Sequence, residues 1–179
     1  MATFTLIASS TVGSGGATSI TFSSIPSTYT DLMIYMSIRS TRTGVNFDSI
    51  GYRFNASTSG YQTRYIYGDG SSASSGADTT FSPAGQVYGR FDGGAINAGN
   101  TTSNTFTSIG LYIPNYAGST NKSFSFEIAA ENNATAGALE VAAGLWSNTA
   151  AITEIQFRDN NLGNIAEHST AYLYGVSNA

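Results

Sequence analysis

Short runs of alternating apolar and polar residues, each bounded by turn-forming residues, constrain the fold of this chain most strongly. The clearest run covers residues 31–39. Its even-numbered residues are aliphatic or Met, and its odd-numbered residues (the other parity) include Met33, Tyr35, Ser37 and Arg39. Side chains two residues apart lie on the same face of a β-strand. The run therefore predicts a strand with one buried face.

Similar runs predict strands at 3–8, 17–22, 50–55, 61–68, 86–91, 105–113, 123–128, 153–158 and 170–176. Residues 139–147 are rich in alanine, which favours a helix. Their period of two, with Val141 and Leu145 opposite Glu140, favours a strand instead and places Glu140 on a solvated face. These runs amount to about ten strands with turns between them, which is typical of a sandwich or barrel.

The composition supports the same fold class. Only 10% of the residues are charged, against about 25% in average soluble domains. Ser, Thr and Asn, which disfavour helix interiors, take their place. We predict an all-β, antiparallel β-sandwich, jelly-roll-like, that forms a single domain over residues 1–179. Strands at both chain ends indicate that the first and last strands pair in one sheet.

Two segments rich in glycine and small polar residues, 68–80 and 92–104, predict long loops. Long loops in a compact domain are commonly functional. We therefore expect these two loops to contact neighbouring proteins.

The charge distribution narrows the classes of partner. The net charge is −4, and the seven basic residues are scattered along the chain. Binding to nucleic acid or to an anionic membrane depends on clustered Lys and Arg, so neither partner is expected. The chain has no cysteine, which excludes disulfides and Cys-based metal sites. We predict no bound cofactor or metal.

The residues that carry catalytic chemistry form no recognisable set. His168 is the single histidine, and Glu127, Glu140 and Glu154 lie at the polar parity of their strands rather than as a pair. Asp69 precedes a glycine, which is more typical of a turn than of a calcium loop. We predict that the chain is not an enzyme.

Tyrosine is abundant, with 11 residues. Tyr set among Ser, Gly and Asn is the composition of adaptable recognition surfaces, and its ring can stack on a sugar. The candidate contacts to a partner or to a glycan are Tyr61, Tyr65, Tyr67, Tyr112 and Tyr116. The alternative is that these rings fill the rim of the sandwich and contacts between subunits.

Five segments together resemble the small virion structural proteins, of the decoration or fibre type, of marine and freshwater tailed bacteriophages. They are TVGSGGATSITFSSIPSTYTDLMI (11–34), YGDGSSASSG (67–76), YIPNYAGSTNKSFSFE (112–127), AGLWSNTAAITEI (143–155) and STAYLYGV (169–176). The resemblance spans nearly the whole chain and carries no catalytic residue.

The resemblance implies a capsid decoration (cement) subunit that stabilises the surface of the phage head. It further implies assembly in the host cytoplasm, localisation in the virion, contact with the major capsid protein or other virion proteins, and a homotrimer. Met33 and Tyr35 are expected to contribute to an apolar patch that binds the shell. The alternative function is a receptor-binding tail-fibre tip that recognises host surface glycans.

Overall fold

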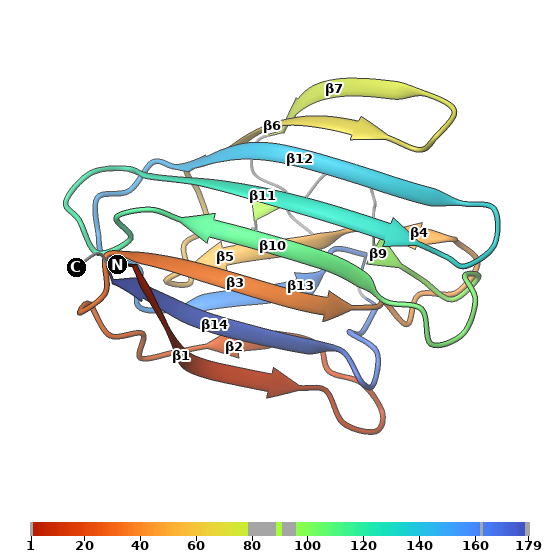
Figure 1. Ribbon diagram of the computed structural model, residues 1–179, viewed down its shortest axis with the longest axis horizontal. Coiled ribbons are helices and arrows are strands. Elements are labelled where there is room, and N and C mark those ends of the chain that lie inside the picture. Colours follow the sequence, from red (N-terminus) through yellow and green to blue (C-terminus); the bar gives the residue numbers. More distant parts are fainter. Residues whose placement is uncertain (1, 79–88, 91–95, 162, 178–179) are drawn as a thin grey trace.

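The computed structural model describes residues 2–78, 89–90, 96–161 and 163–177, and these residues form strands and no helix. It follows that none of them belongs to a membrane-crossing helix. The all-β prediction is confirmed, and the strands form antiparallel sheets that pack as a sandwich (Figure 1). The jelly-roll topology stays a prediction.

The larger sheet has eight strands, in the order β1-β14-β3-β10-β11-β12-β6-β7. Their bounds are β1 Thr3–Thr11, β14 Thr170–Ser177, β3 Asp31–Ile38, β10 Thr107–Ile113, β11 Lys122–Glu131, β12 Gly137–Trp146, β6 Tyr61–Gly68 and β7 Ala73–Asp78. The predicted pairing of the first and last strands is confirmed by the antiparallel ladder between β1 and β14.

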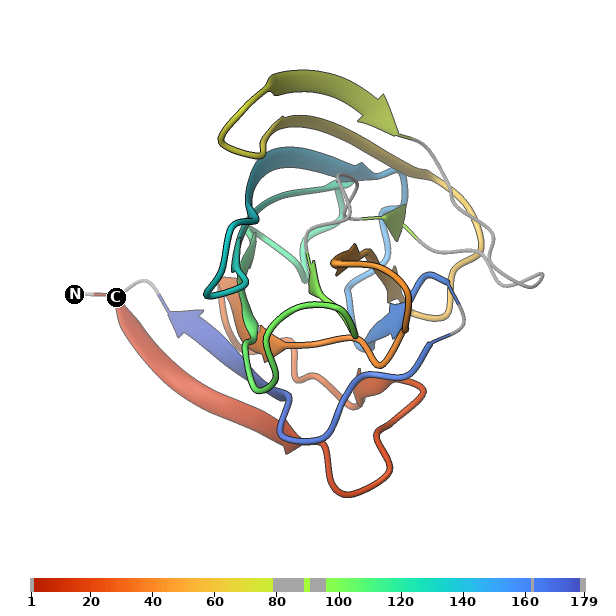
Figure 2. The ribbon, with the colours of Figure 1, turned by 90° about the vertical axis from the view of Figure 1, so that its right-hand side faces the viewer.

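The smaller sheet has four strands, in the order β2-β13-β5-β8, and β4 and β9 form a separate pair. Their bounds are β2 Ile20–Phe22, β13 Ile155–Asp159, β5 Ile50–Phe54, β8 Gly89–Arg90, β4 Phe47–Asp48 and β9 Ile96–Asn97. Seen along the strands, the larger sheet curves around the smaller sheet (Figure 2). The inner face of the larger sheet packs on the smaller sheet, and its outer face points away from it.

The core between the sheets contains an aromatic cluster. The rings of Tyr52, Phe54 and Phe124 lie 5.1–5.5 Å apart, centroid to centroid, and Trp146 stacks on Tyr61 at 6.3 Å. Burying rings of this size contributes strongly to stability, and edge-to-face contacts add to it. Burial also raises the pKa of Tyr61 to about 12.

Two predicted features need correction. The first predicted loop contains β7, whose small residues pair with β6 from Gly68↔Ala73 to Thr63↔Asp78. The second contains β9, where Ile96 and Asn97 are buried. Ser, Gly and Ala are poor strand formers by propensity, but pairing with a neighbouring strand overrides propensity. Residues 79–80 and 92–95 of these segments lie outside the described residues.

Candidate binding face

The outer face of the eight-stranded sheet is the largest regular surface in the described part of the chain. Residues opposite each other in neighbouring antiparallel strands share a face. The registers therefore align Tyr174, Met33, Tyr112, Ser125 and Ala143 in one row across five strands. This outer face divides into two halves that differ in side-chain chemistry.

The first half lies over β14, β3 and β10, and we call it the aromatic half. It is defined by Met33, Tyr35, Tyr112, Tyr172 and Tyr174. Tyr35 and Tyr172 are 45% and 38% exposed, and the rings of Tyr35 and Tyr174 meet edge to face at 6.4 Å.

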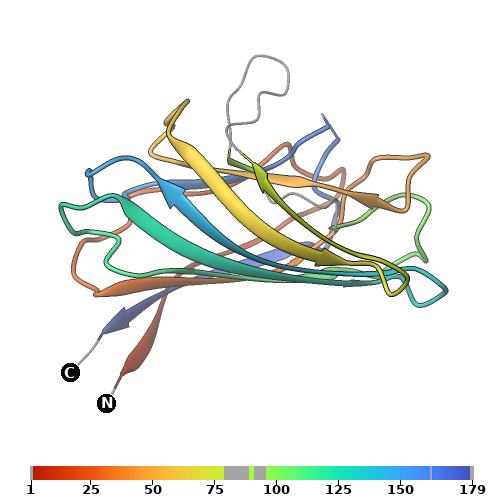
Figure 3. The same cartoon turned by 90° about the horizontal axis from the view of Figure 1, so that it is seen from above.

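Beside the aromatic half, the edge strand β1 exposes Phe4 and Leu6. This end of β1 and the neighbouring end of β14 project from the body of the molecule (Figure 3). The apolar character of the aromatic half therefore continues to the edge of the sheet.

Tyr112 is the member of the aromatic half that the fold holds most firmly. Its hydroxyl donates a 2.6 Å hydrogen bond to Oδ2 of Asp31, whose Oδ1 accepts one from the backbone N–H of Asn115. The hydrogen bond to the Asp31 carboxylate raises the pKa of Tyr112. The hydrogen bond to Asp31 therefore holds the Tyr112 side chain in place on the outer face.

The second half lies over β12 and β6, and we call it the aliphatic half. It is defined by Ile66, Leu139, Val141, Ala143 and Leu145. Ile66, Leu139 and Val141 are 67%, 57% and 53% exposed. Large aliphatic side chains this accessible, on two paired strands, form a contiguous apolar patch of the kind that marks interaction sites.

The aliphatic half reverses a prediction. Glu140 was expected on a solvated face, but it is fully buried, and Val141 and Leu139 point outward. The inward parity of β12 also carries Ala142, Gly144 and Trp146. Trp146 is the residue whose burial sets the orientation of this strand, because its ring packs on Phe54 and Tyr61 in the core.

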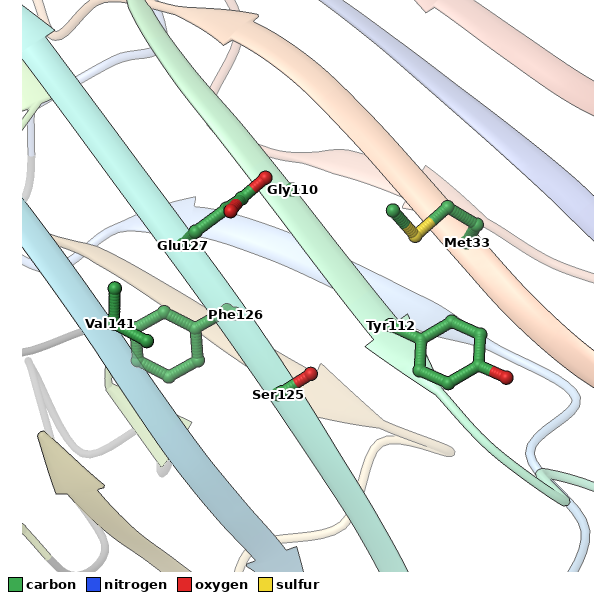
Figure 4. Close-up of a pocket in the computed structure, with 7 residues that line it drawn as sticks. All are labelled: Met33, Gly110, Tyr112, Ser125, Phe126, Glu127 and Val141. Carbon is green, nitrogen blue, oxygen red and sulfur yellow. The ribbon is translucent and has the colours of Figure 1, made fainter.

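A shallow hollow of about 200 Å³ lies near the border of the two halves (Figure 4). It exists because Gly110 has no side chain between Tyr35 and Glu127, its neighbours in the row. Met33, Tyr112 and Val141 also line it. A Cβ at position 110 would lie 3.1 Å from Oε1 of Glu127, so a larger residue there would fill part of the hollow and displace this carboxylate.

Of the five tyrosines predicted as contacts, the structure places only Tyr112 on the outer face. Tyr61 and Tyr116 are buried in the core, which corrects their prediction as partner contacts. Tyr65 and Tyr67 share the inward parity of β6 and are partly buried against the core. The alternation along 61–68 was read correctly, but the side that faces solvent carries Arg64 and Ile66 instead.

The outward residues of the smaller sheet are polar and linked to one another. Gln156 on β13 accepts a hydrogen bond from Arg53 at 2.9 Å and donates one to Thr21 at 3.1 Å. Such a row of paired polar groups has little tendency to bind an apolar partner. The outer face of the larger sheet is therefore the stronger candidate for a binding face.

A buried pair of carboxyl groups, Asp48 and Asp159, was not predicted. The hydroxyl of Ser40 lies 3.1 Å from Asp48 Oδ2 and 2.5 Å from Asp159 Oδ2, and Arg42 forms an ion pair with Asp48 at 3.1 Å. Burial raises the pKa of Asp159, and the neighbouring Asp48 raises it further. Both carboxyl groups are shielded from solvent. Through the hydroxyl of Ser40 they link the ends of β4 and β13, and neither is accessible to a substrate in this structure.

The two remaining residues considered for catalysis or metal binding, His168 and Asp69, lie in turns. His168 is exposed, has a positive φ of 70° and precedes β14. Asp69 forms the β6–β7 turn, where Oδ1 accepts hydrogen bonds from the N–H groups of Ser71 and Ser72. In the described residues, no three His, Asp or Glu side chains are grouped to hold a metal ion.

Comparisons with protein families, with curated proteins and with solved structures found no match for this chain.

Proposed function

We propose that this chain is a virion structural protein, a capsid decoration subunit that binds the head surface of a tailed phage through the aromatic half. The proposal rests on the resemblance of its segments to such proteins. The observation that carries it is the uncovered row of aromatic side chains on a broad sheet. The proposed partner is the major capsid protein, and the proposed function involves no catalysis.

The chemistry of the aromatic half suits attachment to a protein shell. Tyrosine combines a large apolar ring with a hydroxyl that can find a new hydrogen bond, and it is enriched in protein interfaces. Tyr35 and Tyr172 are accessible, and the aromatic half carries no exposed charge that attachment would have to desolvate. Met33 beside them can adapt its shape to a partner.

The test is the copy number and position of the protein in purified particles, by quantitative mass spectrometry and cryo-electron microscopy. We expect hundreds of copies over the head, with the aromatic half against the shell. A few tens of copies at the tail would support a fibre tip instead. Absence from particles would exclude a role in the virion.

A second candidate function, recognition of surface glycans, is favoured by the hollow at Gly110. The ring of Tyr112 and the carboxylate of Glu127 border this hollow, and a sugar is bound by ring stacking and by carboxylates that accept its hydroxyl hydrogens (Figure 4). The test is binding of the purified protein to host polysaccharide. Loss of binding in Tyr112→Ala, with retention in Tyr172→Phe, would support this function.

A further inference from the structure

The aliphatic half has a chemistry that the proposed attachment to a shell does not use. Ile66, Leu139 and Val141 expose more than half of their surface on two paired strands. A second hollow, of about 450 Å³ and lined mostly by apolar atoms, lies between Ile66, Val141 and Ala143. Exposed aliphatic side chains of this kind are stabilised when a matching apolar surface covers them.

Two opposite charges flank this apolar area. Glu127 on β11 lies in the row of Val141 and Ile66, and Arg64 on β6 lies in the next row, opposite Ala143. Both side chains are exposed, and no ion pair joins either to another described residue. Among the described residues, the guanidinium of Arg64 donates its hydrogen bond to the carbonyl of the adjacent Thr63.

The positions of these charges are self-complementary. Glu127 and Arg64 are separated by two strand spacings and one row, which corresponds to about 12 Å. The midpoint between them falls on β12, between Val141 and Ala143. A twofold axis through this point, lying in the plane of the face and perpendicular to the line from Glu127 to Arg64, would bring Glu127 of each copy to Arg64 of the other.

We propose that the aliphatic half joins two copies of this chain about this twofold axis. The contact is isologous: the same patch serves both copies, with Val141 and Ala143 at its centre. Two Glu127–Arg64 pairs close it on either side. Opposite charges placed in this way fix the register of an apolar contact.

The face is large enough for such a pair. Strands β11, β12, β6 and β7 at about 4.8 Å spacing, each about 20–35 Å long, offer roughly 500 Å² before side-chain relief is added. A standard interface covers about 800 Å² per partner. Side-chain relief adds to this planar area, and a face at or below standard size is typical of weak, reversible association, so we expect a dimer with a Kd of about micromolar order.

Sedimentation equilibrium of the purified chain tests the proposal without any phage particle, so its result is separate from that of the proposed function. We expect a monomer–dimer equilibrium. Glu127→Arg and Arg64→Glu should each weaken the dimer at least ~10-fold, because each places like charges across the axis. The double variant should restore the Kd to within about 3-fold of the native value.

The control is Tyr35→Ala in the aromatic half, which should leave the dimer unchanged. Circular dichroism of each variant checks that the fold is retained. A chain that stays monomeric at all concentrations, or a trimer, would overturn the proposal. So would a double variant no better than the singles, or a dimer that survives both reversals, which would point to the free edge of β1.

Discussion

The two halves of the outer face have opposite arrangements of the same kinds of side chain. In the aromatic half, tyrosines point outward and the inward residues of β3 and β10 are aliphatic, including Leu32, Ile34 and Leu111. In the aliphatic half, Ile66 and Val141 point outward and the inward residues include large rings. An aromatic residue therefore does not by itself mark a binding surface in this protein.

The difference arises from how the core is filled. Between the two sheets, the region under β11, β12 and β6 is occupied by Phe124, Trp146 and Tyr61. Close to these rings, the inward positions of β12 hold the small residues Ala142 and Gly144, since protein interiors are close-packed. The larger aliphatic residues of β12 therefore remain outside.

The largest effect is expected from Gly144→Ala, on the inward side of the aliphatic half. A Cβ at this position would lie 2.0 Å from Cε2 of Phe124, and this ring is fixed between Tyr52 and Phe54. We expect a loss of about 3 kcal/mol in the free energy of unfolding, measured by urea denaturation. Ala143→Ser, one residue away and outward, should change it by less than about 0.5 kcal/mol.

The next effect concerns the outward side of the aliphatic half. Val141→Lys would place a charge beside the proposed twofold axis, where its counterpart in the second copy repels it. We expect self-association to weaken by roughly 30-fold in sedimentation equilibrium. Ser37→Lys puts the same charge on the aromatic half and serves as the control. An equal loss in both variants would show that the halves do not differ in role.

Attachment to particles should depend on the aromatic half and not on the aliphatic half, the reverse of self-association. The double variant Tyr35→Ala, Tyr172→Ala removes the two most exposed rings of the aromatic half. We expect binding to particles that lack the protein to weaken by about 10-fold, as for the loss of interface aromatics. Ile66→Ala is the matched control. Undiminished binding of the double variant would exclude the aromatic half as the attachment surface.

Salt should have a smaller effect, and it should weaken self-association through the aliphatic half but not attachment through the aromatic half. The aliphatic half is flanked by Glu127 and Arg64, and exposed ion pairs are screened by salt. Raising NaCl from 50 to 500 mM should weaken self-association by about 3-fold. Attachment through the uncharged aromatic half should stay constant or strengthen. Self-association that strengthens with salt would indicate that the two charges do not pair.

The smallest effect tests the fold that both halves share. Because the pKa of Asp159 is raised, the folded state holds its proton more tightly than the unfolded state. This contribution to stability is complete below the ordinary value of 3.8 and is lost as the pH rises through the raised pKa. In Asp159→Asn, urea denaturation from pH 4 upward should show a flatter dependence on pH than in the native chain.

Asp69→Asn is the opposite control for the pH experiment. Hydrogen bonds from the backbone of Ser71 and Ser72 lower the pKa of Asp69, so its contribution is present above the ordinary value and is lost as the pH falls. If Asp159→Asn shows the same dependence of stability on pH as the native chain, the buried carboxyl pair does not titrate in this range.

The sequence by itself determined that this chain is all-β and where most strands lie. The alternation in residues 31–38 and 123–128, together with the turns between the runs, depends only on local spacing, and β3 and β11 retain it. The pairing of the first and last strands was also predictable. Of the proposed binding residues, Met33, Tyr35 and Tyr112 were predictable, because they share the less aliphatic parity of strands whose other parity is strongly apolar.

Only the tertiary structure decided which face of β12 and β6 is buried. Apolar residues occur on both sides of these strands. A period of two therefore shows that each strand has two faces, but it does not show which face is buried. Trp146 shares the parity of Glu140, and this was the one local signal for the observed orientation. The physical reason is volume: the rings of Trp146, Phe124 and Tyr61 fill the space between the sheets, and that space is defined by residues far apart in the sequence.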